Sequence, residues 1–114
     1  MIRIYVMAVA VLAIVTAVGV QAQVEKGAAQ MTLQGGSRGP VPFPHGDHQN
    51  RLQDCLVCHS VFPQEKGSIE RLKTNGELTK KKVMNTLCIK CHKAEKQAGK
   101  TAGPVTCGQC HVRE

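Results

Sequence analysis

Six cysteines between residues 55 and 110 fall into three pairs of identical spacing, and a histidine follows each pair at once. The motifs read CLVCH at residues 55–59, CIKCH at 88–92 and CGQCH at 107–111. No cysteine is left over. Two cysteines separated by two residues lie one helical turn apart, with the histidine beside them. The chain therefore has three points of attachment or cross-linking, which constrain its fold more than any other feature.

Cys-x-x-Cys-His is the attachment signal for c-type haem. The two thiols can add to the two vinyl groups of one porphyrin, and the histidine then lies beneath the macrocycle and ligates the iron. We therefore expect three covalently attached haem c groups as cofactors. Their predicted attachment sites are Cys55, Cys58, Cys88, Cys91, Cys107 and Cys110, and their predicted iron ligands from the motifs are His59, His92 and His111.

Three other uses of paired cysteines explain the pattern less well. Disulfides would stabilise a small exported domain, but disulfide chemistry gives no reason for a histidine after every pair. A zinc site of four cysteines needs the pairs in twos and would leave one pair over. A redox-active Cys-x-x-Cys normally occurs once, at a helix start in a thioredoxin-like unit.

The chain begins with a segment typical of a secretory signal peptide. Arg3 precedes a long apolar run, and Val20-Gln21-Ala22 supplies small residues at the cleavage spacing. We expect residues 1–22 to be removed after export to the periplasm. A retained membrane anchor is the alternative, because residues 4–20 are nearly long enough to span a bilayer.

The remaining chain has too few apolar side chains for an ordinary core. Leu, Ile, Val and Phe make up 17 of the 92 residues after Ala22, and these 92 contain neither Trp nor Tyr. A share below about one fifth, with a high net charge, is typical of disordered chains. Three attached porphyrins would supply the missing apolar interior. Their six propionates would also offset the net charge of +6 that remains once Arg3 is removed.

Three irons need second axial ligands if they are to transfer electrons without binding a substrate. His45 and His48 are the histidines outside the motifs, and their spacing would place them on one face of a helical turn, within reach of two haems. They could instead be surface histidines in a polar loop. Met84 lies four residues before Cys88, and thioether sulfur is a haem ligand that raises the reduction potential. Met84 could also fill a gap in the interior, and the third iron could bind one of residues 80–82, all lysines, or keep an open position.

From about residue 31 to residue 111 the sequence resembles the three-haem cytochromes c7, small class III multihaem cytochromes related to the four-haem cytochromes c3. The resemblance rests on Phe-Pro-His-x-x-His at Phe43–His48, on the three CxxCH motifs, and on Gly103-Pro104 before the last of them. It implies that His45 ligates the haem of the first motif and His48 the haem of the second.

In such proteins a histidine four residues before the second motif ligates the third haem. This chain has Met84 at that place. The resemblance therefore implies two His/His haems and one His/Met haem, the last held by Cys107, Cys110, His111 and Met84. The segment between His59 and Cys88 also looks longer than in compact members, so we expect an additional loop or helix there.

The expected fold is a small multihaem cytochrome fold, mostly loops and short α-helices wrapped around three haems. Residues 23–30 are expected to form a mobile tail, and residues 31–114 the single haem domain. Met31–Leu33 and Val41–Phe43 flank the turn-rich QGGSRGP, so we expect a two-stranded β-hairpin.

Two helices are expected in the second half of the chain. Ser68 is expected to cap a short helix that ends near Gly76. The other is expected to begin around Thr79 or Thr86 and to end at Gly99.

These features predict an electron-transfer protein and not an enzyme. Its expected partners are redox proteins, either other cytochromes or membrane quinone-linked reductases, and it should not bind the membrane once the leader is cleaved. Binding of nucleic acid is not expected, because export argues against it and the aromatic stacking residues of single-strand binders are missing. Two alternatives stay open: a haem reductase with an open coordination position, and a haem subunit of a larger membrane redox complex or filament.

Overall fold

The computed structural model describes residues 26–79 and 81–113. The predicted signal peptide, residues 1–22, lies outside the described residues, as do the first residues of the predicted tail. Residues 26–30 are exposed and have no regular structure, but they contact the first helix. The carbonyls of Lys26 and Ala29 accept hydrogen bonds from Gln49 Nε2 at 2.6 Å and from the Gly46 backbone N–H at 2.9 Å.

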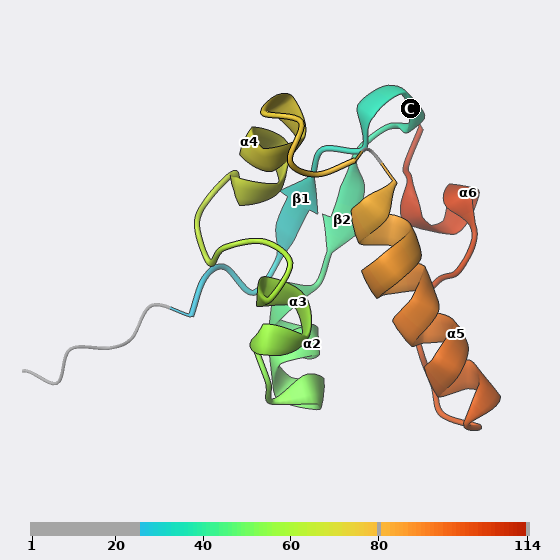
Figure 1. Cartoon of the computed structure of the whole chain (residues 1–114). Helices are drawn as coiled ribbons and strands as arrows, with labels where there is room; N and C mark the ends of the chain where they lie inside the picture. Colours follow the sequence, from blue (N-terminus) through green and yellow to red (C-terminus); the bar gives the residue numbers. More distant parts are fainter. Residues whose placement is uncertain (1–25, 80, 114) are drawn as a thin grey trace, which may run out of the picture.

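A two-stranded antiparallel hairpin lies at the centre of the molecule (Figure 1). Strand β1 (Met31–Leu33) pairs with β2 (Val41–Phe43), with Met31 opposite Phe43 and Leu33 opposite Val41. The connection contains the 3₁₀ helix η1 (Gly36–Arg38), where Gly36 has φ 62°. The hairpin predicted from the sequence is confirmed. It forms because the turn-rich segment between the strands favours a reversal of the chain.

The first two helices follow the hairpin closely. Helix α2 (His45–Leu52) starts after Pro44 and ends at Gln53, which adopts a left-handed conformation with φ 54°. Helix α3 (Leu56–His59) is a single turn made by the first cysteine motif. These helices lie at one end of the hairpin, so the chain reaches the first motif immediately after the residues His45 and His48.

Helix α4 (Ser68–Thr74) occupies the long segment between the first and second motifs, which confirms the predicted extra element. The predicted cap is wrong: Ser68 is the first helical residue, and Gly67 precedes it with φ 73° and no side chain with which to cap. The first turn closes instead through the Arg71 N–H, which donates to the Gly67 carbonyl at 3.0 Å. The helix ends before Gly76 (φ 75°), as predicted.

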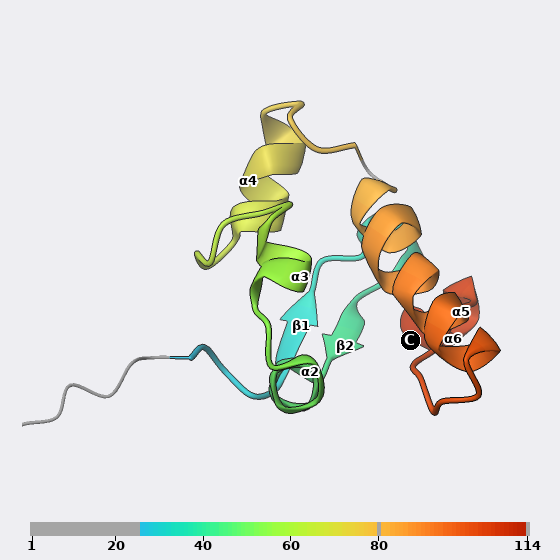
Figure 2. The same cartoon turned by 60° about the horizontal axis from the view of Figure 1, so that its bottom comes forward.

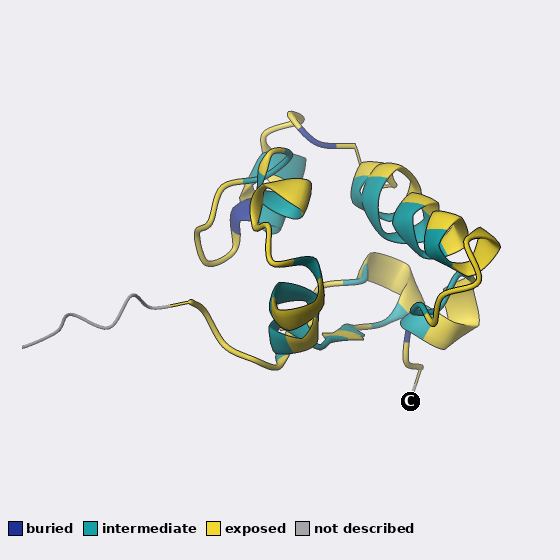
Figure 3. Cartoon of the chain, turned by 90° about the horizontal axis from the view of Figure 1, so that it is seen from below, coloured by how far each residue is buried: buried dark blue, intermediate teal, exposed yellow. Residues whose placement is uncertain are grey.

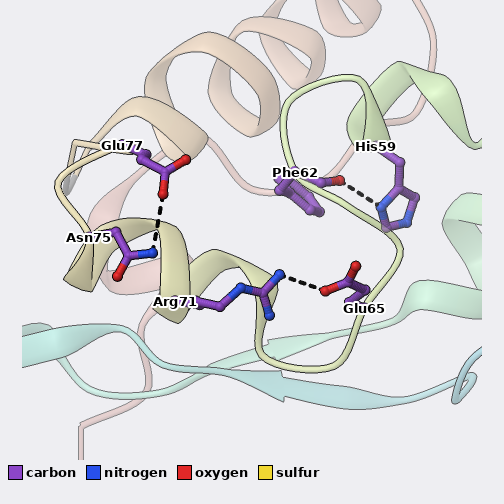
Figure 4. Close-up of polar contacts among 6 residues, drawn as sticks. All are labelled: His59, Phe62, Glu65, Arg71, Asn75 and Glu77. Atoms are coloured by element: carbon purple, nitrogen blue, oxygen red, sulfur yellow. Dashed lines mark hydrogen bonds and ion pairs between the residues drawn. The ribbon is translucent and has the colours of Figure 1, made fainter.

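Local polar contacts hold this segment together (Figure 4). Arg71 pairs with Glu65 at 2.6 Å, and the Asn75 side chain donates to Glu77 at 3.1 Å. The Arg71–Glu65 pair is about half exposed on both sides. Because water screens such pairs, it contributes at most about 1 kcal/mol.

A continuous helical segment, residues 84–97, carries the second motif. It contains the π-helical turn η2 (Met84–Cys88), followed by α5 (Ile89–Gln97). Its end agrees with the prediction, because Gly99 follows with φ 74°. The π turn was not predicted; such turns are rare and are found mostly at functional sites. The last motif forms the single turn α6 (Cys107–Cys110).

The side chains alone form almost no core. Among the described apolar residues only Leu78 is buried, with 4% of its surface exposed. Ser68 and His111 are the buried polar residues, whereas Leu56 in the first motif is 66% exposed. Figure 3 shows the same result, with short buried segments in an otherwise exposed or half-buried chain. The structure thus agrees with the shortage of core residues expected from the sequence.

Helices α4 and α5 stand on opposite sides of the hairpin (Figures 1 and 2). The three motifs are distributed over this frame, on α3, on η2 with α5, and on α6. Across residues 26–79 and 81–113, no helix has both the length and the apolar character needed to cross a membrane.

Candidate haem-binding sites

All three cysteine motifs are helical. The first and third form single turns, α3 and α6, that end at or just before their histidines, whereas the second lies inside the helix made by η2 and α5. The backbone N–H groups of His59 and His111 donate to the carbonyls of Cys55 and Cys107, both at 2.9 Å. This brings the histidine back next to the first cysteine of its own motif. None of the six cysteines forms a disulfide, so all are available for thioethers.

The five described histidines share one hydrogen-bonding arrangement. In each ring Nδ1 lies 2.7–3.1 Å from a backbone carbonyl oxygen. Carbonyl oxygen only accepts, so Nδ1 carries the proton and Nε2 keeps the lone pair. Metal-binding histidines are oriented in this way. The pairs are His45 with Ala28, His48 with Pro44, His59 with Phe62 (Figure 4), His92 with Pro104, and His111 with Gly39.

Two pairs of these rings are neighbours. The centroids of His45 and His59 are 6.3 Å apart with perpendicular planes, and those of His48 and His92 are 6.2 Å apart with planes inclined by 36°. The structure therefore brings each of the two histidines of α2 opposite a different motif histidine. Phe43 packs beside both α2 rings, with centroids 5.9 Å from His45 and 4.6 Å from His48.

This spacing can be compared with what one metal ion between two imidazoles requires. Transition metals bind imidazole nitrogen at about 2.0–2.1 Å, and a five-membered ring with bonds of about 1.33 Å has its atoms about 1.1 Å from the centroid. Two rings on opposite sides of one metal ion are then about 6.2–6.4 Å apart by centroid. Both observed pairs fall in this range, so these residues fit an iron with two axial histidines.

The third motif histidine has a different environment. His111 is only 8% exposed, and its Nε2 is buried without a hydrogen-bond partner. A buried nitrogen without a partner is costly, so a ligand for it is expected. It lies beside a cavity of about 380 Å³, which the described residues Arg38, Cys107, Gly108, His111 and Arg113 line. The orphaned nitrogen and the cysteine in one cavity fit a covalently attached haem.

Met84 is the remaining predicted ligand. It is half-buried at the first position of η2. Among the described residues it is not one of those that line the cavity at His111, so the structure does not bring Met84 and His111 together there. Of the alternative lysines, Lys81 and Lys82 are exposed, and residue 80 lies outside the described residues.

The attachment cysteines of different motifs lie near one another. Burial, with a smaller contribution from the neighbouring Cys58 and Cys110, raises the pKa of Cys88 to about 11. Burial and the nearby Cys91 also raise the pKa of Cys58. These mutual effects link cysteines of all three motifs.

Two glycines that sequence reasoning did not assign to the site press against motif histidines. A Cβ atom at Gly103 would lie 2.8 Å from Nε2 and 2.9 Å from Nδ1 of His92. A Cβ atom at Gly35 would lie 2.5 Å from Nδ1 of His111. Both distances are too short for real contacts, so only glycine fits. The signals in the sequence were the Gly/Pro-rich stretches around both glycines and, for Gly103, its place in the Gly103-Pro104 pair that carries part of the family resemblance.

Comparison with known proteins agrees with this geometry. The family model described as the class III cytochrome c family matches residues 20–111. The chain belongs to the class III cytochrome c family. Cytochrome c7 from Geobacter metallireducens is 34% identical over 75 residues, which cover 66% of this chain and 67% of that protein. Cytochrome c3 from Maridesulfovibrio salexigens is 29% identical over 94 residues, which cover 68% of this chain and 83% of that protein.

Solved structures show the same likeness. The cytochrome c7 PpcC from Geobacter sulfurreducens is 30% identical and superimposes with a TM-score of 0.53, covering 76% of this chain and all of that one. The solution structure of the triheme cytochrome PpcA from the same organism is also 30% identical, with a TM-score of 0.53, and covers 75% of this chain and all of that one.

This class III cytochrome therefore carries three covalent c-type haems, as its three motifs predict. The expected fold, short helices and loops with one two-stranded sheet, is confirmed. Electron transfer is its general function, and it is not an enzyme. Redox partners follow from that function.

Proposed function

We propose that this cytochrome is a periplasmic electron carrier with two His/His haems and one His/Met haem. Residues 1–22 would direct export and be removed, and residues 31–114 would form the haem domain. When bound, the haems supply iron that alternates between Fe(III) and Fe(II). The polypeptide holds each iron with axial ligands that leave no position for a substrate.

The first haem is assigned to Cys55 and Cys58, with His59 and His45 as axial ligands. The second is assigned to Cys88 and Cys91, with His92 and His48. The observation that carries the proposal is the spacing of the two histidine pairs, 6.3 and 6.2 Å between centroids. The carbonyl acceptors at Nδ1 support it, because they hold the rings in place and make Nε2 a better donor to iron.

The third haem is assigned to Cys107, Cys110 and His111, with Met84 as the second ligand. The buried, unpartnered Nε2 of His111 supports the first part. For Met84 the support is its position four residues before Cys88 and its place at the start of the π turn η2. Ligation requires the sulfur to reach the cavity from η2. A His/Met haem has a higher potential than a His/His haem on ligand identity alone, so it would hold the electron longest.

The proposed partners are other cytochromes or membrane quinone-linked reductases, met through small, transient contacts. Exposed lysines support this assignment, since Lys81 and Lys82 lie three and two residues from Met84 along the chain. Positive charge near a haem steers acidic partners toward it.

The absorption spectrum of the oxidised protein tests the ligand assignment. His/Met ligation should produce a weak sulfur-to-iron charge-transfer band in the far red, and Met84→Ala should abolish it. Met31→Ala is the matched control, because Met31 is the other methionine after the leader and lies on β1. The charge-transfer band should persist in Met31→Ala. If the native protein lacks the band, or if Met84→Ala keeps it, Met84 is not a ligand.

The histidine pairs are tested separately with carbon monoxide. His45→Ala and His48→Ala should each open one iron to carbon monoxide, whereas the native protein should not react. A variant that stays low-spin and unreactive would remove that histidine from the assignment.

A further inference from the structure

We propose that Arg38 and Arg113 form a clamp for the two propionate carboxylates of the third haem. The inference rests on the proposed function, because it needs a haem on Cys107 and Cys110 with His111 as its ligand. It adds to that assignment a binding role for two residues outside the cysteine motif and its iron ligands.

The cavity at His111 is the starting observation. Of the five described residues that line it, two are arginines and none is acidic. The other three are Cys107, Gly108 and His111, all from the third cysteine motif. The cavity therefore combines the attachment point of the haem with two permanent positive charges.

The two arginines are far apart in sequence, and a backbone junction brings them together. Arg38 ends η1 in the hairpin connection, and Arg113 follows His111 by two residues. The Val112 N–H donates to the Pro40 carbonyl at 2.9 Å. His111 Nδ1 donates to the Gly39 carbonyl at 2.8 Å. The hairpin connection is thus joined to the C-terminal segment at consecutive residues, which places both guanidinium groups at one cavity.

The backbone is packed too tightly at this junction to accept other residues. Gly39 has φ 92°, and a Cβ atom there would collide with the Val112 carbonyl oxygen. Gly35 is pressed against the His111 ring in the same way. The position of the arginines is therefore set by the fold and not by side-chain flexibility alone.

Guanidinium groups bind carboxylates through a planar fork of N–H donors. The anionic groups of a c-type haem are its two propionates, which stand on different pyrrole rings from the vinyl groups that react with cysteine. Attachment through Cys107 and Cys110 leaves both carboxylates free. The three ion pairs found within residues 26–79 and 81–113 involve neither Arg38 nor Arg113.

The clamp has a consequence for the iron. Positive charge next to the haem disfavours Fe(III), which carries one more positive charge than Fe(II). Compensating the propionate charges therefore raises the reduction potential of the third haem. None of the described residues assigned to the first and second haems lines this cavity, so the potentials of those haems should depend little on either arginine.

The experiment compares Arg38→Gln, Arg113→Gln and the double variant with native holoprotein. Arg71→Gln is the matched control, because Arg71 is an exposed arginine on α4 that pairs with Glu65 and does not line the cavity. An NMR-monitored redox titration resolves the three haems. The double variant should shift the equilibrium of the third haem at least tenfold toward Fe(III), about 59 mV for one electron. The other two haems and the control should change less than about twofold.

A second readout distinguishes carboxylate binding from charge alone. With ¹³C-labelled haem, the carboxylate resonances of the third haem should move in Arg38→Gln and in Arg113→Gln. Arg38→Lys and Arg113→Lys should keep most of the potential but still move those resonances, since lysine keeps the charge and loses the fork. The single variants and the lysine variants keep the test available if the double variant does not fold.

If the third-haem potential and carboxylate resonances match those of Arg71→Gln in every variant, the clamp is wrong and the proposed function stands. If mass analysis of native protein finds no haem on the peptide with Cys107 and Cys110, the proposed function itself fails at this site.

Discussion

Replacing Gly103 by alanine should destabilise the protein by pushing on His92. The new Cβ atom would collide with Cε1 of the ring and would lie 2.8 Å from Nε2 and 2.9 Å from Nδ1. Ordinary contacts begin near 3.4 Å, so the ring must move away by more than about half an ångström. The ring has little freedom, because Nδ1 is bonded to the Pro104 carbonyl at 2.7 Å and Nε2 is proposed to bind iron. Overpacking of this kind costs about 1–3 kcal/mol.

Gly108→Ala is the matched control for this prediction. Nothing lies within 4 Å of a Cβ atom at Gly108, and the equivalent positions in the other motifs carry Leu56 and Ile89. Any Gly→Ala change also stabilises by about 0.4–1 kcal/mol through the unfolded chain. Both variants share that gain, so the difference between them isolates the steric effect.

Thermal unfolding of the holoprotein and its carbon monoxide reactivity measure the effect. For a domain of this size about 1 kcal/mol corresponds to roughly 4–8 °C in Tm. Gly103→Ala should therefore unfold at least about 4 °C below Gly108→Ala, and a fraction of its second haem should bind carbon monoxide. Equal Tm values together with unchanged spectra would refute the argument that Gly103 is reserved for the His92 ring.

Three further predictions follow from the ligands, the core and the attachment sites. Met84→His should lower the reduction potential of the third haem by at least about 60 mV, because imidazole favours Fe(III) more than thioether does. A redox titration measures this, with Met31→His as the control. The prediction is contradicted if both variants match the native protein. Leu78→Ala should lower the free energy of unfolding by about 2 kcal/mol or more, and Arg71→Ala should lower it by less than about 1 kcal/mol. Denaturant titration of both variants compares these losses, and a larger loss in Arg71→Ala would disprove the burial argument. Unfolded holoprotein should contain no free thiol and exceed the polypeptide mass by three haems, and a single reactive cysteine would show that one motif is incompletely attached.

Local features of the fold were predictable because they depend on neighbouring residues. The hairpin follows from two short strands around QGGSRGP, and the ends of α4 and α5 follow from Gly76 and Gly99, both with positive φ. The N-cap of α4 was predicted wrongly, because Gly67 occupies that position and has no side chain with which to cap the helix. The π turn at Met84 was not predictable from propensity, since it inserts one residue into an otherwise ordinary helix.

The sequence by itself determined the number of haems, since the cysteines and histidine of each motif lie within five residues and need no distant partner. It also determined that side chains could not supply the core. The tertiary structure decided which groups come together across the chain. It places His45 beside His59 and His48 beside His92, the pairs that the family resemblance implied as ligands, and it joins the hairpin connection to the segment after α6, which nothing in the sequence indicated. These long-range contacts depend on the path of the backbone between distant residues, and the spacing of residues along the sequence does not determine that path.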